Sequence, residues 1–297
     1  MVKNNIKGEI QMKQTKRIIS SLMILVMALT FVFVPNTASA KTLTAKQILT
    51  KSAAATQKVK NYEGTMNLNL KMKASNQTLN MAAKCSMVNF VNPLKSKIKM
   101  DIDTGLMGKI GLTTYMVQDG ENITTYILLG DTWYKQTVSA EEAGSKAGVD
   151  ASAIASLTNS AYKNFKVTST KEKVNDKKVY TLKGSISGKM IKTVIDQANL
   201  EEVLKSIDPS MDSSVYDTDS KVTIKVWIDQ KTMLPLKYSI DMGEYLESVA
   251  KNMKDSGISS VSKYTISFTF KNYNKAKSFT IPAAAKNAQD LSEIEKQ

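Results

Sequence analysis

The chain has 297 residues, with 41 Lys and Arg against 27 Asp and Glu, which gives a formal net charge of +14. Hydrophobic residues make up 42% and charged residues 23%, which excludes a multi-span membrane protein and a wholly disordered chain. There is no His, the only Cys is Cys85 and the only Arg is Arg17. These absences exclude a Ser–His–acid triad, histidine-based metal sites and an intramolecular disulfide. We therefore expect no catalytic residues, no metal site and no cofactor.

The N-terminal segment has the pattern of an export signal. Residues 1–17 are basic, residues 18–34 are uncharged and rich in large apolar side chains, and Ala38-Ser39-Ala40 is the small-x-small pattern that a signal peptidase reads. We expect residues 1–40 to be a cleavable signal peptide, with a secreted or cell-surface mature chain beginning at Lys41. An uncleaved anchor is the alternative, because an apolar run of this length reaches the lower limit for crossing a bilayer. No Cys follows the run, so a lipobox is absent.

The charge of the expected mature chain is 36 − 26 = +10, and all of its cations are Lys. Lys acts as a solvated point charge, whereas Arg grips phosphate with a planar fork, so this composition argues against nucleic-acid recognition. A diffuse positive surface suits an anionic membrane surface or a wall polymer as a partner. Plain solubility is the alternative reading of the same charge.

The first half of the mature chain changes from helical to strand periodicity. Residues 43–59 have a loosely helical apolar period, with Thr44 as a plausible N-cap. Apolar and polar residues then alternate in six predicted strands joined by short turns: 66–72, 79–87, 97–103, 112–117, 123–129 and 132–138. Connections this short favour antiparallel pairing.

The second half mixes helices with strands. Residues 139–162 are polar and Ala-rich, which predicts a helix or a helix pair. The elements expected after them are a hairpin (165–173 and 178–186), a helix (190–207), a loop (208–220), strands 222–228 and 232–242, a helix (244–253) and a strand (264–270). No linker interrupts this order, so we expect one α+β domain over residues 41–297, with about ten strands and three or four helices.

This order of elements resembles the LolA-like lipoprotein-carrier fold, the related lipid-binding lipoproteins of mycobacteria and a group of exported proteins of Gram-positive bacteria. Three stretches carry the resemblance: Gln47-Ile48-Leu49 through Lys60-Asn61-Tyr62-Glu63-Gly64, the hairpin from Val226 to Lys237, and Ile281-Pro282. The hairpin is the most specific, because Asp229-x-x-Thr232 ends one strand and Leu234-Pro235 begins the next strand.

The resemblance implies a strongly curved, unclosed antiparallel sheet, a half-barrel, with helices covering its concave face. In such families the space between sheet and helices holds acyl chains or lipid-modified peptides. Two departures limit what carries over. This chain has no lipobox Cys, and its mature part has no Arg to match the one that lipoprotein carriers use toward acyl groups.

The apolar face of the first three strands is the candidate ligand-lining surface. Met is flexible and polarizable, and it is over-used where a surface accepts varied apolar partners. Ordinary sheet core is the alternative, which periodicity alone favours, and the resemblance brings the two readings level. Cys85 falls on the same face, where we expect it to be buried and unreactive. The candidate lining residues are Met66, Leu68, Leu70, Met72, Leu79, Met81, Met87, Ile98, Met100 and Ile102.

Other groupings lack the spacing that chemistry needs. Asp208, Asp212, Asp217 and Asp219 do not match a calcium loop, which needs alternate ligands, a central Gly and a closing Glu. Glu141-Glu142 and Glu201-Glu202 are adjacent residues of predicted helices, so neither pair faces one bond together. Trp133-Tyr134 and Trp227 fit sugar stacking or, more commonly, strand packing.

These observations favour an exported cell-envelope binding protein that shields a lipid or acylated ligand between sheet and helices, without catalysis. The alternative is an envelope sensor or protein-docking module whose cavity is filled by its own side chains. A cell-wall hydrolase is the weakest of the three readings.

Overall fold

The computed structural model describes residues 43–74, 77–105, 108–140, 162–197, 213–253 and 258–290. These residues form one sheet of thirteen strands, in the order β13-β6-β5-β4-β3-β2-β1-β12-β11-β10-β9-β7, with β8 paired to β9. Every neighbouring pair is antiparallel except β13 and β6, which run parallel. Because β7 and β13 do not meet, the sheet is unclosed.

The strands are β1 (Asn61–Ala74), β2 (Gln77–Phe90), β3 (Lys95–Asp103), β4 (Lys109–Asp119), β5 (Asn122–Leu129), β6 (Thr132–Ser139), β7 (Lys166–Ser169), β8 (Lys173–Val174), β9 (Lys177–Ser187), β10 (Lys221–Asp229), β11 (Pro235–Asp241), β12 (Ile258–Lys271) and β13 (Gln289–Asp290). The described α-helices are α2 (Ala45–Thr56), α5 (Gly188–Gln197), α7 (Gly243–Asn252) and α8 (Ala283–Lys286). The described residues also include two single-turn 3-10 helices, η1 (Tyr162–Asn164) and η2 (Ser213–Tyr216).

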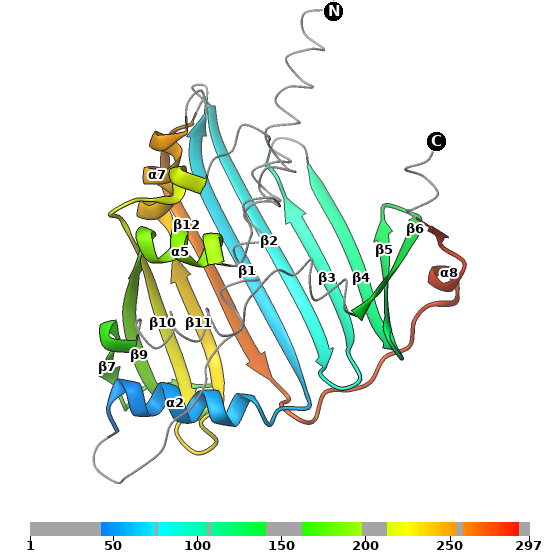
Figure 1. Cartoon of the computed structure of the whole chain (residues 1–297), viewed down its shortest axis with the longest axis horizontal. Coiled ribbons are helices and arrows are strands. Elements are labelled where there is room, and N and C mark those ends of the chain that lie inside the picture. The colour runs from blue at the N-terminus through cyan, green and yellow to red at the C-terminus, as the bar shows by residue number, and fades with distance from the viewer. Residues whose placement is uncertain are drawn as a thin grey trace, which may run out of the picture.

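The sheet is strongly curved, and α2, α5 and α7 lie on its concave face (Figure 1). They gather over the half of the sheet that contains β9 to β12, whereas α8 lies beyond β5 and β6 at the other end. The predicted fold class, an unclosed antiparallel half-barrel with helices on the concave face, is confirmed. The expected count of about ten strands is low, because β8 and β13 have only two residues each and are too short to show a period.

Helix α2 begins where the sequence predicts it. The Thr44 hydroxyl accepts from the backbone N–H of Gln47 at 3.3 Å, and the Gln47 side chain accepts from the backbone N–H of Thr44 at 2.9 Å, which completes a capping box. Ile48 and Leu49 are buried against a cluster that includes Leu182 of β9. The helix therefore closes the lower ends of β9 and β10 (Figure 1).

Alternating side chains divide the central strands between two faces, as predicted. In the register of β1 with β2, Leu70 lies opposite Met81 and Met66 lies opposite Cys85. In the register of β1 with β12, Leu70 lies opposite Tyr264. Because side-chain direction has a period of two, this register places the apolar residues of all three strands on the helix side.

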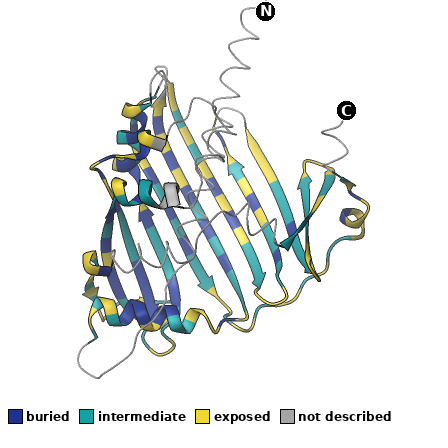
Figure 2. Cartoon of the chain, viewed as in Figure 1, coloured by how far each residue is buried: buried dark blue, intermediate teal, exposed yellow. Residues whose placement is uncertain are grey.

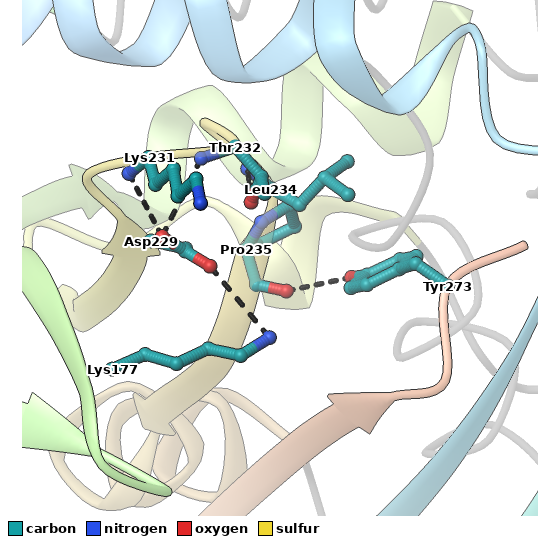
Figure 3. A network of polar contacts seen from close by, with 7 residues as sticks. All are labelled: Lys177, Asp229, Lys231, Thr232, Leu234, Pro235 and Tyr273. Carbon is teal, nitrogen blue, oxygen red and sulfur yellow. Dashed lines mark hydrogen bonds and ion pairs between the residues drawn. The ribbon is translucent and has the colours of Figure 1, made fainter.

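The β10–β11 hairpin is held by the carboxylate of Asp229, a residue that is only 4% exposed (Figure 3). One of its oxygens accepts from the backbone N–H of Lys231 at 2.8 Å and of Thr232 at 3.4 Å, and the other lies 3.7 Å from the ammonium of Lys177. The Tyr273 hydroxyl donates to the carbonyl of Pro235 at 2.6 Å. The Asp-x-x-Thr and Leu-Pro pattern is therefore a structural turn.

The chain after β12 crosses to the opposite edge of the sheet (Figure 1). On the way, the ring of Phe279 packs 5.7 Å from Tyr115 and 6.2 Å from Phe90, measured between ring centroids. It then forms α8 and β13, which pairs with β6 and covers that edge. Neither α8 nor β13 is predicted from the sequence.

Several predicted segments lie outside the described residues. These are the signal peptide over 1–40, the helix or helix pair over 139–162 apart from its two ends, the end of the helix over 190–207, and residues 208–212 of the Asp-rich loop. Both Glu pairs fall in these segments.

Candidate functional site

All ten candidate lining residues lie on the helix-side face of the sheet and belong to one apolar cluster. Half of them are buried: Met66, Leu68, Leu70, Met72 and Met100. The other half are partly buried and pack against that core: Leu79, Met81, Met87, Ile98 and Ile102. The structure therefore brings together the face that the alternation predicts.

Burial on this face falls along a row that runs from the helix-covered half to the uncovered half of the sheet. Neighbouring strands place Ile266, Leu68, Ala83, Ile102 and Ile110 opposite one another in turn. Their exposed fractions rise from 0% at Ile266 through 7% at Leu68 and 9% at Ala83 to 39% at Ile110. Figure 2 shows the same gradient, with buried residues gathered in the half under the helices. The apolar face therefore continues beyond its closed core.

Side chains from α5, η2 and α7 form the opposing wall. Ile191 of α5 and Tyr245 of α7 are 1% and 0% exposed, and both belong to the same cluster as the β1 residues. Tyr216 of η2 joins them and accepts a 3.5 Å hydrogen bond through its carbonyl from the hydroxyl of Tyr245. These residues were not predicted as part of the site, although the apolar period of residues 190–207 and 244–253 predicts the two helices.

One polar group inside this cluster has no hydrogen-bond partner within the described part of the chain. The hydroxyl of Tyr264, on β12 opposite Leu70, is buried and unbonded. Burial raises the pKa of this phenol far above its ordinary value of about 10, so the group is a neutral donor. A buried donor without a hydrogen bond costs free energy, so this hydroxyl would gain from a buried acceptor that comes within reach.

The acidic loop before β10 is a solvated structure where it is described. The carboxylate of Asp219 pairs with the ammonium of Lys189 at 2.9 Å, and both side chains are largely exposed. Their hydrogen bond raises the pKa of Lys189 and lowers the pKa of Asp219. Among the described residues, no group of three or more Cys, Asp or Glu side chains is placed to hold a metal ion.

The two tryptophans pack against strands. Trp227 is 8% exposed; the ammonium groups of Lys225 and Lys237 lie 4.6 Å and 4.9 Å from its ring centroid. Its indole N–H donates to the Glu172 carboxylate at 2.9 Å. Trp133 packs 5.9 Å from the ring of Tyr115. The structure therefore favours the strand-packing reading of Trp227 over sugar stacking.

Cys85 tests the register of this face. It is 3% exposed, and burial raises the pKa of its thiol to about 11. At pH 8 such a thiol is only about 0.1% thiolate, so we expect alkylation by a water-soluble reagent to be at least ~100-fold slower in the native state than in denaturant. The control is a double variant, Cys85→Ser with Ser86→Cys, because Ser86 is exposed on the other face. Its thiol should react at similar rates in both states; equal rates for Cys85 itself would contradict the register.

Most of the chain matches a known protein family. The model of a family of unknown function, DUF6612, matches residues 44–290. The chain belongs to the DUF6612 family. The match spans every described element of the fold, from α2 to β13. No curated protein matches this DUF6612 chain.

Two solved structures are similar to this DUF6612 chain at low levels. One is a DUF1329 family protein from Desulfovibrio piger, with 10% identity and a TM-score of 0.25, covering 79% of this chain and 94% of that one. The other is a domain from Vibrio parahaemolyticus assigned to outer membrane lipoprotein sorting, with 10% identity and a TM-score of 0.25, covering 81% and 95%. Within its described residues, the DUF6612 chain has no helix long and apolar enough to cross a membrane.

Proposed function

We propose that this protein is an exported, non-catalytic binding protein that shields the acyl part of a lipid or lipid-modified ligand between its sheet and helices. The observation that carries the proposal is the methionine-rich apolar face of β1 to β3, which begins as closed core and continues into partly exposed strands. A face that is apolar beyond its own closed core fits an apolar guest. The resemblance of the Asp229–Pro235 hairpin to LolA-like sequences supports the same function.

The hydrophobic effect supplies enough free energy for such binding. Each buried methylene contributes about 0.8 kcal/mol, so ten methylenes contribute roughly 8 kcal/mol before the costs of association. Met66, Met81, Met87 and Met100 lie on three adjacent strands and adapt their side chains to guests of different shape. We therefore expect the protein to select ligands by the length of their acyl chains and to tolerate differences in their shape.

The hydroxyl of Tyr264 has no hydrogen-bond partner among the described residues, so we expect it to contact the carboxyl or ester group of a ligand that displaces the side chains covering it. A Tyr264→Phe variant is expected to bind a fluorescent fatty acid about fivefold more weakly, because one hydrogen bond contributes about 1 kcal/mol. Its melting temperature should not fall, because the hydroxyl has no protein partner among the described residues to lose. Fluorescence titration and calorimetry measure the two quantities. A variant with unchanged affinity would show that no ligand group reaches this position.

The test of the function is saturable binding of a fluorescent fatty acid to the protein from which residues 1–40 have been removed. We expect one saturating phase, competition by unlabelled long-chain fatty acid and weaker competition by an eight-carbon chain, because apolar area drives the binding. No saturation with any acyl probe would overturn the proposal.

A protein-docking function is the second candidate, and the helix-covered half of the sheet favours it. Tyr245, Tyr264 and Ile266 are each 0% exposed, so this half is filled by the chain's own side chains. If the rest of the face is filled in the same way, no acyl probe binds, and the protein's partners are other envelope proteins.

A further inference from the structure

The face of the sheet that points away from the helices carries two neighbouring rows of residues that are polar except for Trp227. In the first row, paired strands place these residues side by side: Lys166, Lys183, Lys225, Ser239, Ser267, Asn67 and Lys84. In the second row, two residues along each strand, the series is Trp227, Lys237, Thr269, Thr65, Ser86 and Lys99. We call the two rows the lysine belt. None of these positions carries a carboxylate, and the first row ends where Asp101 follows Lys84 on the next strand.

The belt contains a charge arrangement that folding alone does not favour. Lys183 lies directly opposite Lys166 on one side and Lys225 on the other. Like charges directly opposite one another in a sheet are destabilising, so the two opposed pairs at Lys183 cost stability, and the chain offsets this only at Lys225, which lies 3.9 Å from Glu172. Lys71 and Lys263, further along the same face, form another directly opposed pair. The arrangement makes physical sense if anionic groups from outside the chain lie between these lysines.

The other residues of the first row can donate hydrogen bonds to such anionic groups. Between Lys225 and Lys84 the row consists of Ser239, Ser267 and Asn67, all partly exposed, whose hydroxyl and amide groups donate hydrogen bonds. Strands are spaced about 4.8 Å apart, so seven positions span about 29 Å. Two acidic groups of the chain lie beside the first row: Glu172 is 3.9 Å from the ammonium of Lys225, and Asp101 lies opposite Lys84, where the row ends.

We infer that the lysine belt binds a flexible, linear polyanion whose phosphate-bearing units also carry hydroxyl groups. The sheet is convex on this side, so a flat bilayer would meet it along a line only, whereas a flexible polymer follows both rows. A single-stranded nucleic acid fits less well, because its bases stack on open aromatic surfaces. The belt's one aromatic ring, Trp227, is 8% exposed beneath Lys225 and Lys237. This inference concerns the opposite face from the proposed acyl site and stands independently of it.

The test is titration of the protein lacking residues 1–40 with poly(glycerol phosphate) at several salt concentrations. Phosphate contacts release counterions, so we expect affinity to fall steeply as salt rises. Phosphatidylglycerol vesicles and an oligonucleotide of equal charge are the comparison probes, and both should bind more weakly than the polymer. Tighter binding to either one would overturn the inference, as would no polymer binding at 50 mM salt.

Two triple variants with the same net charge locate the contact. Lys166→Gln, Lys183→Gln and Lys225→Gln together should weaken polymer binding at least tenfold and lower the salt slope by about 2, since each phosphate contact on a flexible single strand contributes about 0.7. The control is Lys46→Gln, Lys51→Gln and Lys286→Gln, at exposed positions of α2 and α8, which should change affinity less than about twofold.

Stability separates a binding role from a structural one. Removing opposed like charges should leave the melting temperature of the belt variant unchanged or higher, because the partly exposed Lys225–Glu172 ion pair that is lost with them contributes little. Weaker binding together with a lower melting temperature, or an equal loss of binding in the control, would contradict a site on the belt.

Discussion

A Met81→Lys variant is expected to fold and to lose detectable binding of a fluorescent fatty acid. Met81 lies on β2 opposite Leu70 and packs against the edge of the apolar cluster, where it is only partly buried. Its position lets a lysine stem reach water with its ammonium, so the fold should lose no more than about 2 kcal/mol. An acyl chain over the same spot would have to bury that ammonium without a partner, at a cost of several kcal/mol.

The matched control is Ala82→Lys, one residue further along the same strand. Ala82 is exposed on the opposite face, between Asn69 and Asp103 of the neighbouring strands. It adds the same charge to the same strand and should leave both affinity and melting temperature unchanged. Binding and melting should be measured on one sample of each variant. If Met81→Lys binds the probe as tightly as the unsubstituted protein, the ligand does not lie on this face.

A Gly188→Ala variant is expected to be destabilised by about 3 kcal/mol, which lowers the melting temperature by roughly 6–12 °C in a domain of this size. Gly188 begins α5, and its backbone N–H donates to the carbonyl of Ser220 at 2.9 Å. A methyl group there would lie 2.6 Å from the carbonyl oxygen of Thr218 and 3.0 Å from the ring of Tyr245. Relieving the clash requires backbone movement that separates α5 from η2 and α7, so acyl binding should weaken as well.

Gly111→Ala is the control for Gly188→Ala. Gly111 lies in β4, and a methyl group added to it meets nothing within 4 Å. Replacing a strand glycine at a compatible position reduces the entropy of the unfolded chain, so this variant should be neutral or slightly stabilised. Thermal unfolding of the two variants side by side checks the prediction. Equal stabilities would show that α5 is not held against Thr218 as described.

The alternation of apolar and polar residues was sufficient to predict the central sheet. Met66 to Met72 and Leu79 to Met87 have an unbroken period of two, and the structure pairs them in the expected hairpin with Cys85 facing inward. The helix capped by Thr44 was predictable for a similar reason, because a capping box is a local signal. Local patterns of this kind determine both the secondary structure and the face on which a residue lies.

Long-range register was not predictable in the same way. The pairing of β1 with β12 joins residues about two hundred positions apart, so Tyr264 could not be placed beside Leu70 from the sequence. The lysine belt has the same origin, since Lys183 and Lys225 are not near neighbours in the chain. The lysines are spread along the sequence, so the sequence indicates only a diffuse positive charge. The pairing of strands brings some of them into one row.

Native mass spectrometry of the protein, purified from its own host without detergent, tests the acyl-binding function most directly. We expect a population heavier than the polypeptide by the mass of a lipid or acylated molecule, which organic extraction releases and identifies. The Met81→Lys protein, prepared in the same way, should lack this heavier population, and the Ala82→Lys protein should retain it. A single species at the mass of the polypeptide, with no lipid in the extract, would contradict the account and leave a filled interior serving a docking function.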